Sequence, residues 1–319
     1  MPHQVLPASP VQRLDHPILQ RHQIELWIKR DDLLHPMLIG NKYRKSAVYF
    51  RQALAYGVGT LVSFGGAYSN HLLALAAMGQ HTGIRTVGCI RGEIDRSNAP
   101  ILAQCAAYGM HLISLSRSAY YPEQQQMSTA LRQQLQPFAP YQIVPEGGTS
   151  AACLPDVAQI ISELFAPIHK DHPPFDWIVC PVGTGGTVAG LLYGLQQQAV
   201  PHCRVLALCA AKGYTQLPDQ GAQALQHIYA GDAVALSQAL ARLVIDDRAA
   251  YAGFGRVNAS FLAELRALQA GLGVPLDYVY TAKAFYRLFE RIQQGEIEQG
   301  ARMVFIHTGG YQTAAIAPY

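Results

Sequence analysis

The sequence predicts an α/β protein built from two open, twisted parallel sheets, each with helices on both faces. Short apolar runs typical of buried strands alternate with longer amphipathic runs typical of helices, and this alternation starts again after Gly147. The 319 residues are enough for about two lobes. Glycines gather at several strand-to-helix junctions, where a doubly wound sheet opens its ligand-binding cleft.

The first run of elements ends near residue 144. Short stretches rich in β-branched and aromatic residues indicate strands at 24–30, 60–64, 85–90, 111–115 and 141–144. Capping residues or a proline indicate helices that begin at Asn41, Ser69, Asn98 and Pro122. Glycines at 57, 79 and 109 end the first three of these helices. Strand, helix and strand in this order predict a parallel sheet with helical crossovers.

The second run of elements begins at Ser150. We expect helices at 150–165, after 187, at 258–272 and at 281–294, with strands at 176–180, 205–208 and 303–306. Residues 212–257 indicate irregular helical structure in which no element is placed. We expect one larger domain from residues 1–50 together with 147–319, and a smaller α/β domain from residues 51–146.

The composition excludes several classes of protein. Charged residues make up 14% of the chain, against about 25% in an average domain, and the net charge of +3 is too small to predict a nucleic-acid or membrane-surface site. No apolar run reaches the roughly 18 residues of a membrane span, and the N-terminus lacks a signal-peptide pattern, so we expect a cytoplasmic protein. The six cysteines form no CxxC pair, which predicts reduced, buried thiols and no metal site.

Lys42 stands in the first turn of the helix predicted from Asn41, its N-cap. The N-terminus of a helix is the positive end of its dipole, so a lysine there should have a lowered pKa and more of the neutral amine that acts as a nucleophile. The alternative is that Lys42 extends into solvent beside Arg44 and Lys45.

The segment Gly183-Thr184-Gly185-Gly186-Thr187 lies between a predicted strand and a predicted helix. Glycines let backbone N–H groups converge at a helix N-terminus, and two threonines add hydroxyl donors, so the segment predicts a phosphate cradle without a lysine. It is neither a P-loop nor a dinucleotide fingerprint. A plain tight turn is the alternative.

Three further groups stand at predicted strand ends or helix starts. Ser69-Asn70-His71 would place an exposed helix N-terminus in the cleft to hold an anion, although Ser69 or Asn70 is equally typical of a simple N-cap. His307-Thr308-Gly309-Gly310 follows the last strand and should also open on the cleft. Tyr280 precedes a helix in the same way, and a buried core aromatic is its alternative.

Together, in this order, these motifs resemble the pyridoxal-phosphate enzymes of the tryptophan synthase β-subunit fold (fold type II). Within that fold they are most similar to the family of 1-aminocyclopropane-1-carboxylate (ACC) deaminases and D-cysteine desulfhydrases. The resemblance covers nearly the whole chain and is carried by residues 28–32, 40–42, 69–71, 183–187, 279–281 and 307–310.

The resemblance implies a role for each of these groups. Lys42 would form a Schiff base with pyridoxal 5'-phosphate. The cofactor-binding residues implied with it are Asn70 at the ring hydroxyl, Gly183, Thr184, Gly185, Gly186 and Thr187 at the phosphate, and Thr308. The implied substrate-binding residues are Ser69, Asn70, His71, Tyr280 and Phe254, of which Ser69 and Tyr280 would share catalysis with Lys42.

The branch of the family follows from chemistry at the cofactor ring. ACC deaminases carry a glutamate after the tyrosine that matches Tyr280, whereas this chain has Thr281 there and a further hydroxyl at Thr308. A neutral hydroxyl cannot keep the ring nitrogen protonated as a carboxylate does, which makes the ring a weaker electron sink. This difference, together with His71 in place of glutamine, favours the desulfhydrase branch. The segment Gly253-Phe254-Gly255 departs from the family pattern, because the family often has a second active-site tyrosine where this chain has Phe254.

The sequence therefore predicts a PLP-dependent lyase that carries out α,β-elimination on a small amino acid. D-Cysteine, giving pyruvate, ammonia and hydrogen sulfide, is the leading substrate, and ACC or another β-substituted amino acid is the first alternative. A phosphate- or nucleotide-binding α/β protein without a covalent cofactor is the alternative from another class. A third possibility is a cofactor-binding protein that has lost turnover, for which Phe254 is the hint. Relatives of this fold are commonly dimers, so we expect a homodimer.

Overall fold

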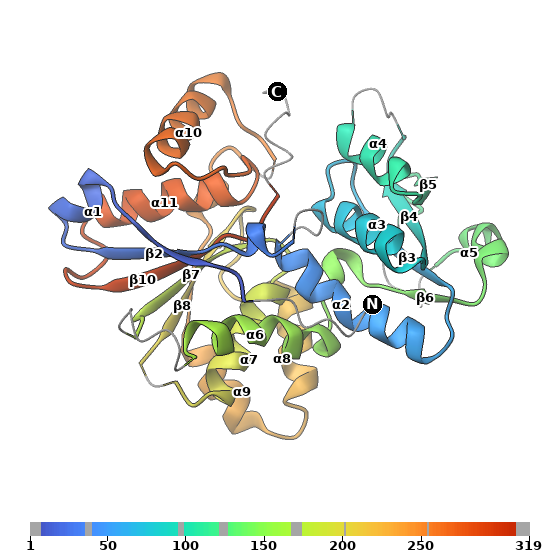
Figure 1. Ribbon diagram of the computed structural model, residues 1–319, viewed down its shortest axis with the longest axis horizontal. Helices are drawn as coiled ribbons and strands as arrows, with labels where there is room; N and C mark the ends of the chain where they lie inside the picture. The colour runs from blue at the N-terminus through green and yellow to red at the C-terminus, as the bar shows by residue number, and fades with distance from the viewer. Residues whose placement is uncertain are drawn as a thin grey trace.

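Two parallel sheets form the framework of the chain (Figure 1). The computed structural model describes residues 8–35, 40–94, 99–120, 127–166, 174–200, 202–253 and 255–310. In spatial order, the six strands of the larger sheet are β1 (Val11–Leu14), β2 (Glu25–Lys29), β10 (Arg302–Ile306), β7 (Trp177–Val182), β8 (Arg204–Cys209) and β9 (Leu243–Asp246). The four strands of the smaller sheet are β5 (His111–Leu115), β4 (Arg85–Arg91), β3 (Thr60–Gly65) and β6 (Tyr141–Ile143). Every pairing is parallel except that of β1 with β2.

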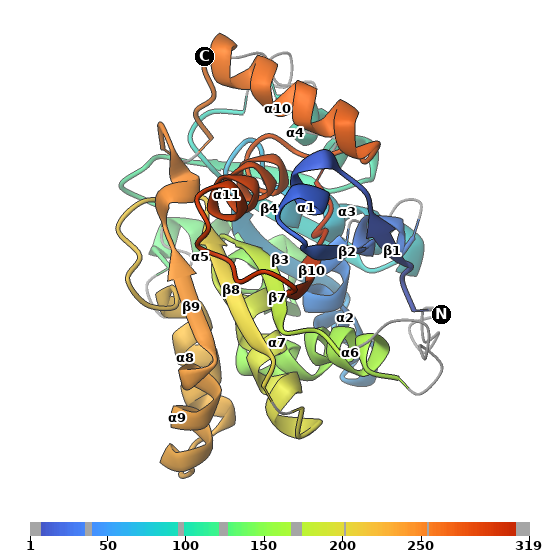
Figure 2. The ribbon, with the colours of Figure 1, turned by 90° about the vertical axis from the view of Figure 1, so that its left-hand side faces the viewer.

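Helices cover both faces of both sheets, which confirms the predicted fold class. On the larger sheet, α1 (Pro17–Arg21), α10 (Ala259–Leu272) and α11 (Thr281–Gln293) pack on one face, and α6 (Leu154–Leu164), α7 (Gly186–Gln197), α8 (Asp219–Ile228) and α9 (Ala233–Ala241) pack on the other (Figure 2). On the smaller sheet, α2 (Gly40–Ala55), α3 (Asn70–Thr82) and α4 (Pro100–Ala107) face α5 (Thr129–Leu135) across the strands. Short 3₁₀ helices lie at Asp31–Leu33, Gln136–Phe138, Glu146–Gly148, Ala151–Cys153 and Arg248–Ala250. The sheets are joined through α2, which also packs against α6.

The predicted elements differ from the structure mainly at the edges of the sheets. The 212–257 region, left without elements, contains α8, α9 and the edge strand β9, which pairs only with β8 in the described chain. A four-residue edge strand needs no long apolar run, so its pattern is weak. The antiparallel strand β1 was missed for the same reason. The expected helix starts at Asn98 and Pro122 fall outside the described residues, and α4 and α5 begin a few residues later.

The division into domains stays a prediction, which the strand membership of the two sheets supports: residues 60–143 supply the smaller sheet, and the flanking segments supply the larger one.

All six cysteines are buried and free, and burial raises the pKa of each thiol, that of Cys89 to about 12. In the part of the chain that the structure describes, no helix has both the length and the apolarity needed to span a membrane.

An ion cluster around Asp246 ties β9 to α11, and it leads to a prediction about acid stability. Arg287 Nε and Arg291 Nη1 donate to Asp246 Oδ2 over 2.9 and 2.8 Å, and the Arg248 backbone N–H donates to Oδ1 over 2.9 Å. Burial alone would raise the pKa of Asp246, but these arginines outweigh it and lower the pKa to about 2. A lowered carboxyl pKa stabilises the fold above the ordinary value of 3.8 and loses that contribution as the pH falls to about 2.

We therefore expect Asp246→Asn to lower Tm at neutral pH and to flatten the fall of Tm between about pH 4 and pH 2. Thermal unfolding followed by circular dichroism across that range measures both effects. The matched control is Asp247→Asn, which removes the neighbouring carboxylate that accepts the Gly213 N–H. If Tm falls with pH as steeply in Asp246→Asn as in the parent protein, this carboxylate is not the cause of the acid sensitivity.

Candidate active site

The first turn of α2 is wedged between the end of β10 and the start of α7. Gly40 has φ +41°, and a Cβ there would lie 2.4 Å from the Thr308 carbonyl oxygen, so glycine is required at this contact. The Asn41 N–H donates to that carbonyl over 3.3 Å, and Asn41 Nδ2 donates to Thr187 Oγ1 over 2.8 Å. Asn41 is therefore not the expected N-cap: it lies inside α2, and its side chain fastens the helix to α7.

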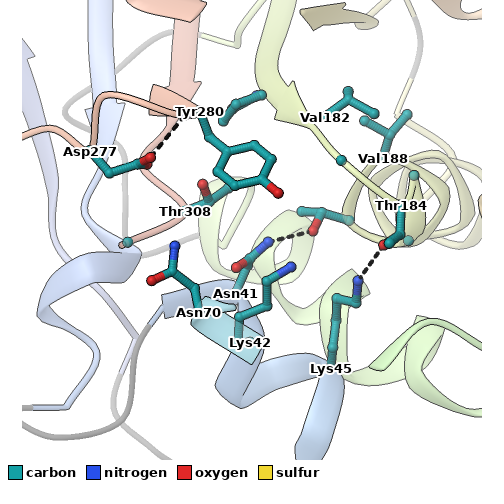
Figure 3. Close-up of a pocket in the computed structure, with 16 residues that line it drawn as sticks. Asn41, Lys42, Lys45, Asn70, Val182, Thr184, Val188, Asp277, Tyr280 and Thr308 are labelled. Carbon is teal, nitrogen blue, oxygen red and sulfur yellow. Dashed lines mark hydrogen bonds between the residues drawn. The ribbon is translucent and has the colours of Figure 1, made fainter. Parts of the chain in front are cut away.

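Lys42 extends from this turn into a cavity between the two sheets (Figure 3). The side chain is half-buried, and burial lowers the pKa of its amine against smaller opposing effects of Cys180, Cys153 and Asp277. The direction agrees with the prediction, although burial rather than the helix dipole is the main cause. The alternative of a lysine extended into solvent is wrong, because Lys42 lines the cavity and its neighbours Arg44 and Lys45 are buried.

The predicted cradle lies beside Lys42, between β7 and α7. Gly183, Thr184, Gly185, Gly186 and Thr187 all line the cavity. Gly185 precedes α7 with φ +82°, and no side chain caps the first N–H groups of this helix. Those N–H groups are therefore available to an anion in the cavity.

The cradle itself has no lysine, but Lys45 from α2 contacts it, which the sequence analysis did not indicate. Lys45 Nζ, on α2, donates to Thr149 Oγ1 over 2.7 Å and to Thr184 Oγ1 over 3.1 Å, and the two hydroxyls are 2.7 Å apart. Burial and the nearby Lys42 lower the pKa of Lys45 well below its ordinary value. Gly186 leaves room for this arrangement, since a Cβ there would lie 2.5 Å from Thr149 Oγ1. The spacing of three residues from Lys42 was the signal in the sequence that could have indicated Lys45.

Ser69 and Asn70 stand at the start of α3, on the other side of Lys42. Ser69 Oγ accepts the Leu72 N–H over 3.3 Å and so is the N-cap of α3, while Ser69 also lines the larger part of the cavity. Asn70 is buried and faces the cavity, and its Oδ1 has no hydrogen-bond partner among the described residues. Leaving a buried amide oxygen without a hydrogen bond costs free energy, so Asn70 Oδ1 is suited to accept a hydrogen bond from a ligand.

His71 is held in one tautomer by a short hydrogen-bond chain. Ser63 Oγ donates to the Val144 carbonyl over 2.8 Å, so the same oxygen accepts from His71 Nε2–H at 2.8 Å. Burial, reinforced by Lys42 and Lys45, lowers the pKa of His71 well below its ordinary value, which keeps the ring neutral. Nδ1 then presents a lone pair, for which the described part of the chain offers no hydrogen-bond donor.

Tyr280 packs its ring against the cradle, and a Cβ on Gly183 would lie 3.1 Å from Tyr280 Cε1. The backbone N–H of Tyr280 donates to Asp277 Oδ1 over 2.8 Å, which fixes the tyrosine at the start of α11 (Figure 3). Burial raises the pKa of the Tyr280 phenol, and Asp277 raises it further, so the hydroxyl keeps its proton. The alternative of a fully buried core aromatic does not hold, since Tyr280 lines the cavity and is partly exposed.

Thr281 and Thr308 differ in their access to the cavity. Thr308 lines it, whereas Thr281 is fully buried and its hydroxyl accepts the Asp277 N–H over 2.8 Å. The carboxylate of Asp277 lies in the cavity wall instead, a residue that the sequence analysis missed although Asp-x-x-Tyr before a helix is typical of an Asx turn. His307 is buried behind the cavity, where its Nδ1 accepts the Gly309 N–H over 3.1 Å and supports the Thr308 turn.

The cavity widens from Lys42 toward α3 and the segment before α10. This wider part has a volume of about 830 Å³, large enough for a cofactor ring and an amino acid. Three charged residues absent from the sequence analysis line it: Arg91, Glu146 and Arg256. Phe254 lies outside the described residues, and its neighbours Gly255 and Arg256 line the wider part of the cavity.

Comparisons with known proteins agree with this geometry. The family described as "Pyridoxal-phosphate dependent enzyme" matches residues 6–309. The D-cysteine desulfhydrase of Serratia proteamaculans (strain 568) is 31% identical over 293 residues, which cover 90% of this chain and 86% of the relative. That of Yersinia pestis (strain Pestoides F) is 30% identical over 290 residues, with the same shares covered. A crystal structure described as an ACC deaminase homologue superposes with a TM-score of 0.73 at 23% identity, covering 96% of this chain and 91% of the other, which shows a shared fold.

Proposed function

The chain belongs to the family of pyridoxal-phosphate dependent enzymes, and from this premise we propose that it is a lyase acting by α,β-elimination on a small amino acid, with D-cysteine as the leading substrate. The observation that carries the proposal is the position of Lys42. Its amine has a lowered pKa and lies between an anion-binding cradle and a wider cavity. Relatives named D-cysteine desulfhydrase, at 30–31% identity over 90% of the chain, support the choice of substrate.

The described residues fit pyridoxal phosphate group by group. The uncapped N-terminus of α7, with Lys45 and Thr184, suits the phosphate dianion. The orphaned Oδ1 of Asn70 suits a hydroxyl on the ring, and the amine of Lys42 suits the aldehyde. The nucleotide-binding alternative without a cofactor is set aside by the family membership.

The protein's own residues supply binding and proton transfer. Bound pyridoxal phosphate supplies an aldehyde that captures amines and a ring that accepts the electron pair left at the α-carbon. Lys42 Nζ, more readily neutral than an ordinary lysine, takes the proton from the α-carbon, with Ser69 Oγ as the second candidate base. The Tyr280 hydroxyl, whose raised pKa keeps it protonated, donates a hydrogen bond to the departing thiolate sulfur. The backbone N–H groups at the start of α3, beside Asn70, hold the substrate carboxylate. Neutral His71, whose Nδ1 presents a lone pair, can accept a hydrogen bond from the substrate but cannot donate one to its carboxylate.

The polar side chains that line the cofactor side of the cavity bear on the choice between the desulfhydrase and the ACC deaminase branches. The neutral hydroxyl of Thr308 lines the cofactor side of the cavity, which favours elimination of a good leaving group over opening of a cyclopropane. Asp277 adds a carboxylate to the same wall, but both its oxygens already accept hydrogen bonds from the segment that begins α11. ACC and other β-substituted amino acids therefore remain the second candidates.

Product assays on the purified holoenzyme test the proposal. D-Cysteine should give pyruvate, ammonia and sulfide in equal amounts, with L-cysteine as the stereochemical control. Formation of 2-oxobutyrate from ACC, without sulfide from D-cysteine, would replace the substrate with ACC. Absence of any product from D-cysteine, L-cysteine, ACC and β-chloro-D-alanine would overturn the lyase proposal and favour a protein that binds the cofactor without turnover. The homodimer and the cytoplasmic location stay predictions.

Lys45 is expected to contribute to cofactor affinity rather than to proton transfer. Lys45→Met removes the amine that donates to Thr149 and Thr184, so the Kd for pyridoxal phosphate should rise by about 10- to 100-fold. Absorbance titration of the apoenzyme with the cofactor measures the change, and Lys212→Met, at an exposed lysine, is the matched control. An unchanged Kd for Lys45→Met would place the phosphate elsewhere.

A further inference from the structure

Lys283, on the first turn of α11, is fully buried and donates only to main-chain oxygens. Its Nζ lies 2.8 Å from the Arg256 carbonyl oxygen, 2.9 Å from that of Gly253 and 3.4 Å from that of Ala250. Among the described residues, these three carbonyls are the hydrogen-bond acceptors of the ammonium, and none of them is a carboxylate. We call Nζ and these three carbonyls the carbonyl tether.

The tethered backbone is a series of tight turns, in which the Gly253 N–H donates to the Ala250 carbonyl over 2.8 Å and the Arg256 N–H donates to the Gly253 carbonyl over 3.2 Å. It runs from the 3₁₀ helix Arg248–Ala250 toward α10 through left-handed conformations, with φ +47° at Tyr251, +119° at Gly253 and +70° at Gly255. A carbonyl oxygen has two lone pairs, so the Lys283 ammonium adds a second hydrogen bond at Ala250 and Gly253, and its three donors fasten these turns and the Arg256 carbonyl to α11. Burial lowers the pKa of Lys283 to about 8, which shows the cost of holding a cation there.

The same backbone forms one wall of the wider cavity. Ala252, Gly255, Arg256 and Val257 line it, and none of them lines the cradle side. Lys283 stands three residues after Tyr280, which lines both parts. The carbonyl tether therefore joins the wall that faces an incoming substrate to the helix that begins at Tyr280.

We propose that Lys283 is a positioning residue for the substrate: its ammonium fixes the segment around Gly253 and Arg256 against α11 and so sets the distance between that wall and Tyr280. The inference rests on the proposed function only in taking an amino acid as the occupant of the wider cavity. It assigns to Lys283 an effect on substrate binding that is separate from cofactor binding, since the carbonyl tether contacts no residue of the cradle.

Lys283→Met in the holoenzyme tests this assignment. We expect KM for the amino-acid substrate to rise by about 10-fold, with kcat within about 3-fold and the Kd for pyridoxal phosphate unchanged. Amide hydrogen exchange should become faster at residues 250–253 and 255–257, and trypsin should cut after Arg256 more readily. Lys283→Gln, which keeps two N–H donors, should recover part of the KM and of the exchange protection.

A matched control separates positioning from general stability. Leu288→Ala, one turn further along α11 and fully buried, removes core contacts without touching the carbonyl tether, so it should lower Tm and leave KM unchanged. Unchanged KM and exchange in Lys283→Met would overturn the proposal, as would a KM increase of equal size in Leu288→Ala. If Lys283→Met does not fold, Lys283→Gln decides by the same readouts.

The readouts also distinguish failure of the Lys283 proposal from failure of the proposed lyase activity. Exchange and trypsin cleavage need no turnover. If none of the amino acids is turned over, the lyase proposal fails, while faster exchange confined to 250–253 and 255–257 still supports the carbonyl tether. Turnover of D-cysteine with the same KM in Lys283→Met and the parent protein confirms the lyase and overturns the tether as a determinant of substrate binding.

Discussion

Lys42→Ala is expected to abolish covalent attachment of the cofactor and to lower kcat/KM by at least about 10⁴-fold. The substitution removes both the amine that bonds to the aldehyde and the proposed base at the α-carbon. Loss of a catalytic base alone lowers the rate by about 10²- to 10⁴-fold. The protein should still fold, because Lys42 is half-buried with its amine in the cavity and the neighbouring Asn41 carries the anchoring hydrogen bond to Thr187.

Borohydride reduction followed by peptide mapping makes the test specific. In the parent protein the visible absorption band should disappear on reduction and the label should map to Lys42. Lys45→Ala, three residues along the same helix, is the matched control: it should bind cofactor more weakly and still be labelled at Lys42. A label on Lys45, or an absorption band that survives in Lys42→Ala, would refute the assignment.

Arg44→Met is expected to destabilise the fold by about 3–5 kcal/mol, the typical result of removing one partner from a buried ion cluster. Arg44 stands two residues after Lys42 and makes two hydrogen bonds to each of two carboxylates. It donates to Asp31 over 2.8 and 2.9 Å and to Glu163 over 2.7 and 2.9 Å. Burial would raise the pKa of Asp31, but Arg44 outweighs it and the net shift is downward. Without Arg44, two carboxylates share one remaining buried cation, Lys29.

Urea unfolding followed by tryptophan fluorescence measures the loss. Arg51→Met is the matched control, because Arg51 lies on the same helix and pairs with the single carboxylate of Asp156 over 2.6 Å at a partly exposed site. That pair should contribute at most about 1 kcal/mol. Equal losses in the two variants would show that the Arg44 cluster does not anchor α2.

The alternation of strands and helices could be predicted from sequence because buried parallel strands are continuous apolar runs bounded by capping residues. The positions of Lys42, Ser69, Asn70 and the cradle at strand-to-helix junctions followed from the same pattern. These residues do meet around one cavity in the structure, and their individual roles stay predictions.

Lys45 and Asp277 carry local signals in the sequence, but those signals do not say what either side chain meets, for a shared physical reason. Lys45 is an ordinary helix residue until the fold brings Thr149, more than 100 residues away, against its amine. Asp277 marks an Asx turn, and only the packing of α11 against the cavity shows that its carboxylate lines the site. The region 212–257 was missed because its short edge strand and its glycine turns are held by distant partners such as Lys283.

The place of β10 in the larger sheet has a consequence for how the protein is made. This strand is the last in the described chain, yet it lies between β2 and β7, and the turn that follows it holds Gly40 and Asn41 at the start of α2. On the ribosome, the smaller sheet can assemble once residues 60–143 have emerged, whereas we expect β1 and β2 to join the larger sheet only after residue 306 has emerged. We therefore expect nascent chains that stall before residue 302 to contain every cradle residue and Lys42 without an ordered site.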